Sequence, residues 1–173
     1  MNVSLFSSES ECRILELKEP IVLNSKNFKE FDEKLDDFAQ SKRDLDILVF
    51  EIRSGKTNRL IRVYSEDDGL VLFNSQRSNS EHLLIDNKCQ DKVQKLISTI
   101  DSKNYMVTCL DYSSSIKLTV FMIKKKGNNF FSLSINSDDF LYSQDGANRE
   151  VIFDEIQLLK AIYGIANKDR ATN

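Results

Sequence analysis

The sequence predicts an α+β domain, in which one or more antiparallel β-sheets are covered by three helices. Apolar residues recur at every third or fourth position in three segments, which is typical of amphipathic helices. In several shorter segments they recur at every second position, which is typical of strands with one buried face. Turn-forming residues separate most of these shorter segments and favour hairpins. A chain of 173 residues suits one globular domain, residues 1–173.

The first half of the chain contains a short strand, a helix and three strands. The first strand spans residues 13–17 and is closed by Pro20. The helix that follows has four large apolar side chains on one face: Phe28, Phe31, Leu35 and Phe38. The three strands are predicted at residues 46–53, 59–64 and 70–73.

The second half repeats this order and adds a last helix. Its first helix has an apolar face made of Val93, Leu96, Ile97 and Ile100. Three strands are predicted at residues 105–110, 116–123 and 130–135. In the last strand, Phe131, Leu133 and Ile135 are expected to face the core, and Ser132 and Ser134 the solvent. The final helix, about 151–166, directs four residues inward: Ile152, Ile156, Leu159 and Tyr163.

The two halves are consistent with an internal repeat of an αβββ unit, at residues 27–75 and 90–137. Lys34 and Leu35 recur as Lys95 and Leu96, at an offset of 95 minus 34, or 61 positions. Few residues are identical, so chance similarity stays an alternative. On either interpretation, antiparallel hairpins need a cover on one face, which the three helices can supply.

Composition limits the function classes. There are 24 basic and 27 acidic residues, and this net charge of −3 argues against a dedicated nucleic-acid binder. The amino-terminal segment has no apolar signal-peptide core, and no stretch is long enough for a membrane helix. The three cysteines are widely spaced, so no disulfide framework is predicted, and Cys109 is interpreted as a small core residue. A reducing cytoplasm is therefore the expected compartment.

No motif indicates catalysis, and we predict neither enzymatic turnover nor a bound metal or cofactor. His82 is the only histidine and is interpreted as an exposed loop residue. The cysteines lack the spacing of zinc ligands or of thiol chemistry. Adjacent carboxylates such as Asp67 and Asp68 point apart on a strand or helix, so they are interpreted as surface groups. A carboxylate-based hydrolase stays a minor alternative.

An acidic segment is the best candidate for binding a partner. Residues 136–156 contain six acidic residues and one basic residue, a local charge of −5, and Phe140 and Tyr142 lie among them. Aromatic anchors supply contact energy, and the charges steer a basic protein toward them. Favourable interaction with the dipole of the last helix explains Glu150, Asp154 and Glu155 well, but it explains Asp138 and Asp139 poorly. The predicted partner-binding residues, with a second acidic turn included, are Glu66, Asp67, Asp68, Asp138, Asp139, Phe140, Tyr142 and Asp145.

A run of three lysines, Lys124 to Lys126, has two interpretations. Lysines at the end of a strand protect sheet edges against aggregation. They could also contact a phosphate or nucleic acid. The sequence leaves both open.

The segment NSKNFKEFDEKLDDFAQSKRDLDILVFEI, followed by a hairpin and EDDGLVLFNS, resembles small immunity proteins of bacterial polymorphic and contact-dependent growth-inhibition toxin systems. The resemblance is one of layout and covers residues 24–75. It implies a cytoplasmic, non-catalytic toxin inhibitor that acts by protein–protein interaction with a cognate toxin domain, often a nuclease. The chain has no tryptophan and a single proline, Pro20, and so lacks the carboxyl-terminal tryptophan and proline signals of some of these families.

Two other classes stay open. Type III secretion chaperones are also small, acidic and α/β, and bind an effector, usually as dimers. A small nucleic-acid or phosphate binder would use the lysine run. Whether the protein is a monomer or a dimer is not predicted, and the partner is not identified.

Overall fold

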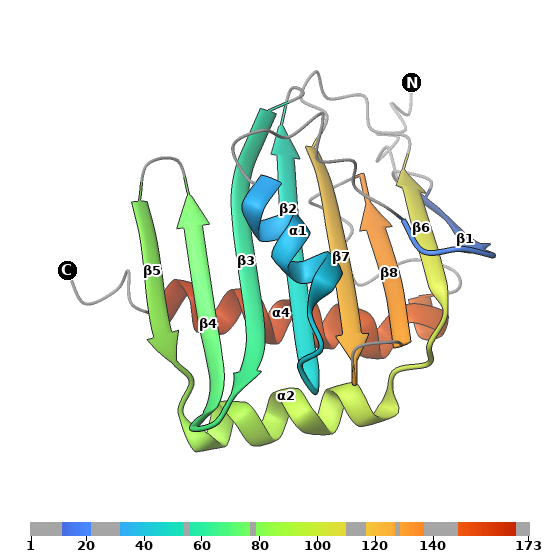
Figure 1. Cartoon of the computed structure of the whole chain (residues 1–173). Helices are drawn as coiled ribbons and strands as arrows, with labels where there is room; N and C mark the ends of the chain where they lie inside the picture. Colours follow the sequence, from blue (N-terminus) through green and yellow to red (C-terminus); the bar gives the residue numbers. More distant parts are fainter. Residues whose placement is uncertain are drawn as a thin grey trace, which may run out of the picture.

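The computed structural model describes residues 12–21, 32–53, 56–76, 79–109, 117–126, 129–136 and 149–168. These residues form one mostly antiparallel sheet with helices on both faces, which confirms the α+β class (Figure 1). The strands are β1 (Cys12–Leu17), β2 (Leu45–Arg53), β3 (Lys56–Glu66), β4 (Gly69–Gln76), β5 (Asn79–Leu84), β6 (Asn104–Cys109), β7 (Lys117–Lys125) and β8 (Asn129–Ile135). The helices are α1 (Asp32–Gln40), α2 (Asn87–Thr99) and α4 (Phe153–Lys168), the last preceded by a 3-10 turn, η3 (Arg149–Ile152). None of these helices is long and apolar enough to cross a membrane.

The sheet has the strand order β1-β6-β8-β7-β2-β3-β4-β5. Strands β2 to β5 follow one another as a meander, whereas β8 lies between β6 and β7 and pairs with β6 in parallel. The two predicted αβββ units therefore share the order of elements along the chain but not the order of strands in the sheet. The repeat hypothesis concerns only the order of elements along the chain.

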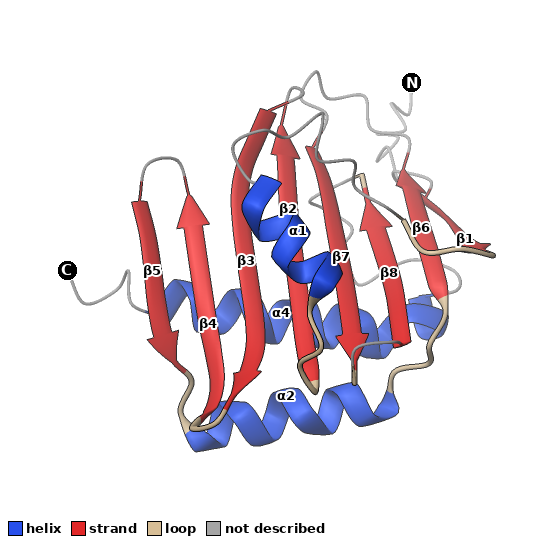
Figure 2. Ribbon diagram, viewed as in Figure 1, coloured by secondary structure: helices blue, strands red, loops and turns tan. Residues whose placement is uncertain are grey.

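The helices cover both faces of the sheet, not one as the sequence suggested. Helix α1 lies on the front face in Figure 2, α4 lies behind the sheet, and α2 runs along the lower end of the strands and contributes to the same core as α4. Strand β2 is consequently buried along its length except for Arg53, because its alternate side chains enter two different cores. The core on the α1 face contains Leu35, Phe38, Leu48, Phe50, Ile52 and Val120. The core on the other face contains Val93, Ile97, Leu133, Ile135 and the four predicted inward residues of the last helix: Ile152, Ile156, Leu159 and Tyr163.

These clusters confirm most of the predicted apolar faces. Leu118 and Leu96 are only half-buried, and they pack at the edges of their clusters. Phe28 and Phe31 lie outside the described residues. The helix faces could be predicted because a period of three and four identifies the buried stripe before its packing partner is known.

The prediction that Ser132 and Ser134 face solvent is wrong, since both are buried. Ser132 has hydrogen-bond partners inside the fold. Ser132 donates its backbone N–H to Asn104 Oδ1 at 2.9 Å, and its hydroxyl accepts the backbone N–H of Ile21 at 2.7 Å. A serine in alternation with apolar residues indicates the less apolar face of a strand, but it does not show whether another segment covers that face.

Strand β5 was not predicted. Its sequence, NSEHLL, has no alternation of apolar residues, and five of its six side chains are exposed. It forms by pairing with β4, where His82 lies opposite Phe73 and the two rings meet edge to face at 4.8 Å between centroids. His82 is exposed as expected, but it belongs to an edge strand and not to a loop.

Cys12 and Cys109 form a disulfide, which corrects the expectation of unpaired cysteines. The two residues lie directly opposite each other in the antiparallel pair of β1 and β6. Cys109 is buried, as predicted, while Cys89 is free and half-buried. Ninety-seven positions separate the partners in the sequence, so their proximity depends on the pairing of β1 with β6 and leaves no local signal.

We predict that removal of this bond, by the double change Cys12→Ser and Cys109→Ser, lowers the free energy of unfolding by about 2–5 kcal/mol. The bond closes a loop of about a hundred residues and restricts the unfolded chain, and it ties the edge strand β1 to the sheet. Urea unfolding under oxidising conditions measures the difference. Cys89→Ser is the control and should shift the midpoint little; an equal shift in both variants would contradict this role.

Candidate partner-binding surface

The first part of the predicted surface is an exposed acidic turn between β3 and β4. Glu66 ends β3 and pairs with Gly69, so Asp67 and Asp68 form a two-residue hairpin loop, and all three carboxylates are exposed. Gly69 has a φ of 131°, and a side chain there would collide with Gln90 of α2 at 2.6 Å from the added carbon. The turn thus depends on a backbone conformation that favours glycine, and it lies close to the side-chain amide of Gln90 in α2.

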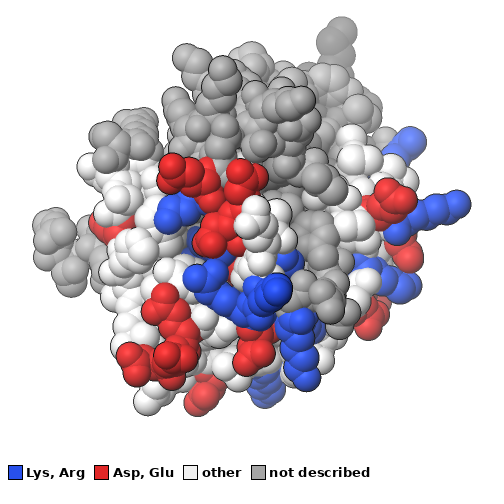
Figure 3. Space-filling view, viewed as in Figure 1, with Lys and Arg blue, Asp and Glu red and all other residues white. Residues whose placement is uncertain are grey.

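Acidic side chains gather at the lower left of Figure 3, where Figure 1 shows the β3–β4 turn. The remaining predicted residues, Asp138, Asp139, Phe140, Tyr142 and Asp145, lie outside the described residues. The structure therefore neither brings them to the acidic turn nor separates them from it.

The acidic turn and the lysine run lie at the same end of the sheet. Strands β3 and β7 flank β2, and Asp46 near the start of β2 lies opposite Tyr64 on one side and Lys124 on the other. The acidic turn and the lysine run therefore place opposite charges at the same end of the sheet.

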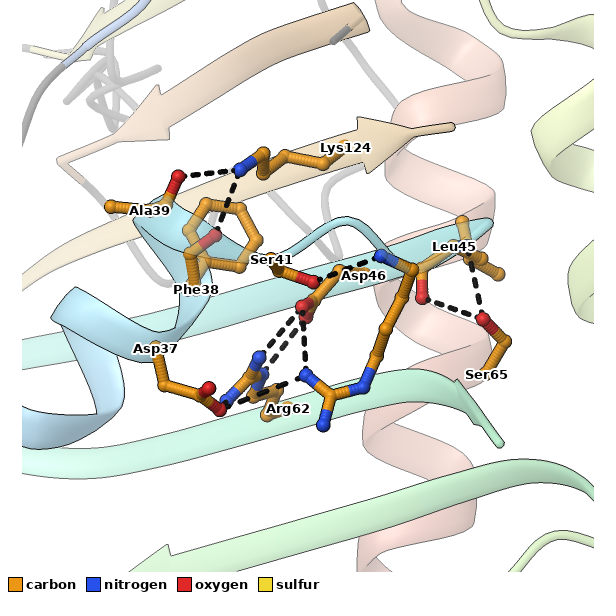
Figure 4. Close-up of polar contacts among 10 residues, drawn as sticks. Asp37, Phe38, Ala39, Ser41, Leu45, Asp46, Arg62, Ser65 and Lys124 are labelled. Carbon is orange, nitrogen blue, oxygen red and sulfur yellow. Dashed lines mark hydrogen bonds and ion pairs between the residues drawn. The ribbon is translucent and has the colours of Figure 1, made fainter. Parts of the chain in front are cut away.

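Two of the three lysines bind the ends of helices. Lys124 donates to the carbonyl oxygens of Phe38 and Ala39 at 3.0 and 2.7 Å, near the end of α1 (Figure 4). Lys125 points to the opposite face and donates to the carbonyl oxygen of Ile97 in α2 at 2.6 Å. Burial lowers the pKa of both ammonium groups. The last carbonyls of a helix lack intrahelical donors and carry partial negative charge, so each lysine stabilises one helix end.

A cluster of charged residues lies beneath α1, and the sequence analysis missed it. Arg62 on β3 donates two hydrogen bonds to Asp46 on β2, at 2.9 and 2.6 Å, and also pairs with Asp37 of α1 (Figure 4). Its hydrogen bond lowers the pKa of Asp37. Burial alone would lower the pKa of Arg62, but its bonds to Asp46 and Asp37 raise it. In the sequence, the only sign of this cluster is a charged residue at an inward position of an apolar strand: Asp46 in β2 and Arg62 in β3.

A second polar cluster lies on the opposite face, under α4. Tyr163 donates its hydroxyl to Glu51 of β2, and the bond and burial raise the pKa of the tyrosine. Arg59 of β3 donates to Asn74 and to Asn167 of α4, both at 3.0 Å. These groups bind one another and hold α4 to the sheet.

Glu155, near the start of α4, is a buried carboxyl group with no side-chain partner in the described part of the chain. Only 4% of the residue is exposed, and burial raises its pKa to about 7. Asp154 and Asp101 add negative charge nearby, while a bond to its own backbone N–H lowers the pKa. Tyr105 of β6 also interacts with it.

Within the described ranges, no group of three or more His, Cys, Asp or Glu residues could hold a metal ion. Comparison with known proteins gives no relative: no protein-family model matches the chain, and no curated protein or solved structure is significantly similar to it.

We predict that Lys124→Met lowers the free energy of unfolding by about 1–3 kcal/mol, because the two bonds to α1 involve a charged donor. Methionine keeps most of the aliphatic stem and removes the ammonium. Lys126→Met, at the exposed end of the same run, is the control. Equal urea midpoints for the two variants would show that Lys124 does not stabilise α1.

We also predict that stability falls as the pH rises from about 4.5 to about 7. Because the pKa of Glu155 is higher in the folded state than its ordinary value of 4.5, the folded protein binds more protons in this window. The loss from this group is about 3 kcal/mol, at about 1.4 kcal/mol per pH unit. The lowered pKa of Asp37 acts below this window, where it favours folding as the pH rises toward about 4.

Urea unfolding across this pH range tests the effect with Glu155→Gln, which should flatten the slope and make the protein more stable than the wild type near pH 8. Glu150→Gln, an exposed residue of η3, is the matched control. An unchanged slope in Glu155→Gln would contradict the assignment.

Proposed function

We propose that this protein is an immunity protein, which binds and neutralises a basic toxin domain such as a nuclease. The proposed contact surface consists of the acidic turn, Glu66 to Asp68, together with Asp138, Asp139, Phe140, Tyr142 and Asp145. The single observation that supports it most is the placement of three exposed carboxylates on a tight hairpin turn that Gly69 closes. A fixed acidic surface can occupy a positive substrate cleft and compete there with phosphate.

We propose further that binding, and not turnover, is the activity, with no metal or cofactor. The buried charged residues described above interact with each other and with helix ends, which supports a structural role for them. The partner is expected to be a protein, without direct contact to nucleic acid or a membrane.

The compartment is the part of the proposal that the disulfide affects most. Disulfides persist in oxidising compartments and are rare in cytosolic proteins. The Cys12–Cys109 bond thus argues against the cytoplasm, which stays a prediction from the sequence. Acid quenching of cells of the native host, followed by alkylation of free thiols under denaturing conditions, distinguishes the two, because the reduced protein would be labelled at three cysteines and the oxidised protein only at Cys89.

A secretion chaperone is the second candidate, and strand β5 favours it. Among the described strands, β5 pairs only with β4, and Leu84 at its end is 56% exposed. An open edge of this kind can accept a strand from an extended effector or from a second copy. Light scattering on the purified protein separates this candidate from a monomeric inhibitor.

A phosphate or nucleic-acid binder has less support. Lys124 and Lys125 already donate to helix carbonyls, so the run does not present three ammonium groups to solvent. Salt-sensitive binding of nucleic acid in the absence of a protein partner would favour this class.

We predict that reversing the acidic turn, with Glu66→Lys, Asp67→Lys and Asp68→Lys together, slows association with the toxin domain encoded next to this protein at least tenfold at low salt. Charges at the rim of an interface act mainly on the association rate. Association rates at several salt concentrations and rescue of toxin-expressing cells are the measurements. Tyr142→Ala should instead accelerate dissociation, with a loss of about 2 kcal/mol.

Glu81→Lys is the control for charge, because it lies on β5 away from the turn and is also exposed. All variants should unfold at the wild-type midpoint within a small margin. Full rescue and an unchanged association rate after reversal of both acidic segments would reject the proposed surface. If no neighbouring protein is toxic or binds, the immunity assignment itself is rejected.

A further inference from the structure

A groove runs between the outer surfaces of α2 and α4, on the side of these helices that faces away from the sheet. It has a volume of about 210 Å³. Helix α2 contributes Cys89 and Lys92, which are one turn apart, and α4 contributes Gln157, Lys160, Ala161, Gly164, Ile165 and Lys168. The groove plays no part in the function proposed above.

The groove is basic, although the chain as a whole is acidic. Among the described residues, the eight that line it include three lysines and no carboxylate. Lys168 reaches across from α4 and donates to the sulfur of Cys89 at 3.4 Å. Asp86 at the start of α2 lies nearby, but it already accepts the backbone N–H of Cys89 at 2.9 Å, a bond that lowers its pKa. The groove therefore presents positive charge along an apolar floor that includes Ala161 and Ile165.

Gly164 leaves one wall of the groove open. It lies within α4, where glycine lowers helix stability by about 1 kcal/mol relative to alanine. An added side-chain carbon at Gly164 would meet no atom within 4 Å, so the fold does not need glycine there for its own packing. A glycine in the middle of a helix also permits a partner to approach the backbone closely.

We propose that this groove binds an acidic segment of a partner protein, which inserts an apolar side chain beside Gly164 and pairs its carboxylates with the flanking lysines. Charge complementarity identifies the occupant as acidic. The apolar floor and the open space at Gly164 favour a peptide over a free phosphate, which would use neither. A second copy in a symmetric arrangement would bring lysines against lysines, which is repulsive.

The spacing of the lysines defines the segment further. Lys160 and Lys168 are eight residues apart on one helix, which corresponds to about 12 Å along its axis. Gly164 lies midway between them. A partner helix with glutamates at positions i and i+8 and a leucine at i+4 matches this spacing. Its carboxylates would pair with Lys160 and Lys168, and its leucine would lie beside Gly164.

The test uses a synthetic helical peptide with this Glu-Leu-Glu spacing, labelled for fluorescence anisotropy, and the oxidised full-length protein. A matched peptide replaces both glutamates by glutamine. Cys89 is the only cysteine outside the disulfide, so its rate of maleimide labelling reports occupation of the groove. The acidic peptide should bind saturably at low salt, at least tenfold more tightly than the glutamine peptide, and should slow the labelling of Cys89.

Three variants locate the binding. Gly164→Leu fills the open space with a good helix former, so it should retain the fold and weaken binding at least tenfold. Lys168→Gln should weaken binding severalfold and reduce its salt dependence. Lys95→Gln, which removes an exposed lysine of α2 outside the groove, is the matched control and should bind as the wild type does. Circular dichroism and unfolding midpoints check that each variant is folded.

Several outcomes would overturn the proposal: no saturable binding at millimolar peptide, equal binding of the acidic and glutamine peptides, or unaltered binding by folded Gly164→Leu. An unchanged rate of maleimide labelling at Cys89 in the presence of the acidic peptide would also overturn the proposal. Reversal of Glu66 to Asp68 removes negative charge close to α2 and should not weaken binding of the acidic peptide, so failure at the groove and failure of the toxin-binding surface are separable results.

Discussion

The burial of strand β2 on both faces is the constraint on which the rest of the structure depends. Its carboxylates, Asp46 and Glu51, enter opposite cores, and a buried charge without a partner is strongly destabilising. Asp46 binds Arg62, which reaches Asp37 of α1, and Glu51 accepts the hydroxyl of Tyr163 in α4. On the neighbouring strand β7, Lys124 and Lys125 bind the ends of α1 and α2. Each helix is thus attached to the sheet by a polar contact from one of two central strands.

This arrangement uses buried charge for positioning and leaves the periphery available for binding. Apolar packing alone tolerates small shifts of a helix along the surface of the sheet, whereas a hydrogen-bonded ion pair is satisfied at one position only. The acidic β3–β4 turn and the basic α2–α4 groove are built on elements held in this way. The two surfaces carry opposite charge and both adjoin α2, because Gly69 of the turn lies beside Gln90 and the groove is lined by Cys89 and Lys92.

The disulfide has a different role, since it acts at the edge of the sheet. Strand β1 pairs only with β6 among the described strands, and the Cys12–Cys109 bond fixes that pairing. Asn136 supports the same site, because its side chain accepts the backbone N–H of Cys109 at 2.7 Å and donates to its carbonyl oxygen at 3.2 Å. The opposite edge strand, β5, is not tied by a disulfide, and five of its six side chains are exposed, so among the described strands it is the more accessible edge for an added strand.

The sequence by itself determined every described helix, every described strand except β5, and most of the apolar faces, because periodicity is a local property. Leu35 and Phe38, Val93 and Ile97, and Ile156 and Leu159 could be assigned to helix faces without any knowledge of their neighbours. It also located the acidic turn, whose glycine marks a tight hairpin. Only the tertiary structure decided which face each helix covers, that Ser132 is buried, and that Cys12 meets Cys109. It also decided that Lys124 binds a helix end and that three lysines of α2 and α4 line one groove. These features depend on contacts between residues far apart in the chain, and such contacts leave no pattern in the local sequence.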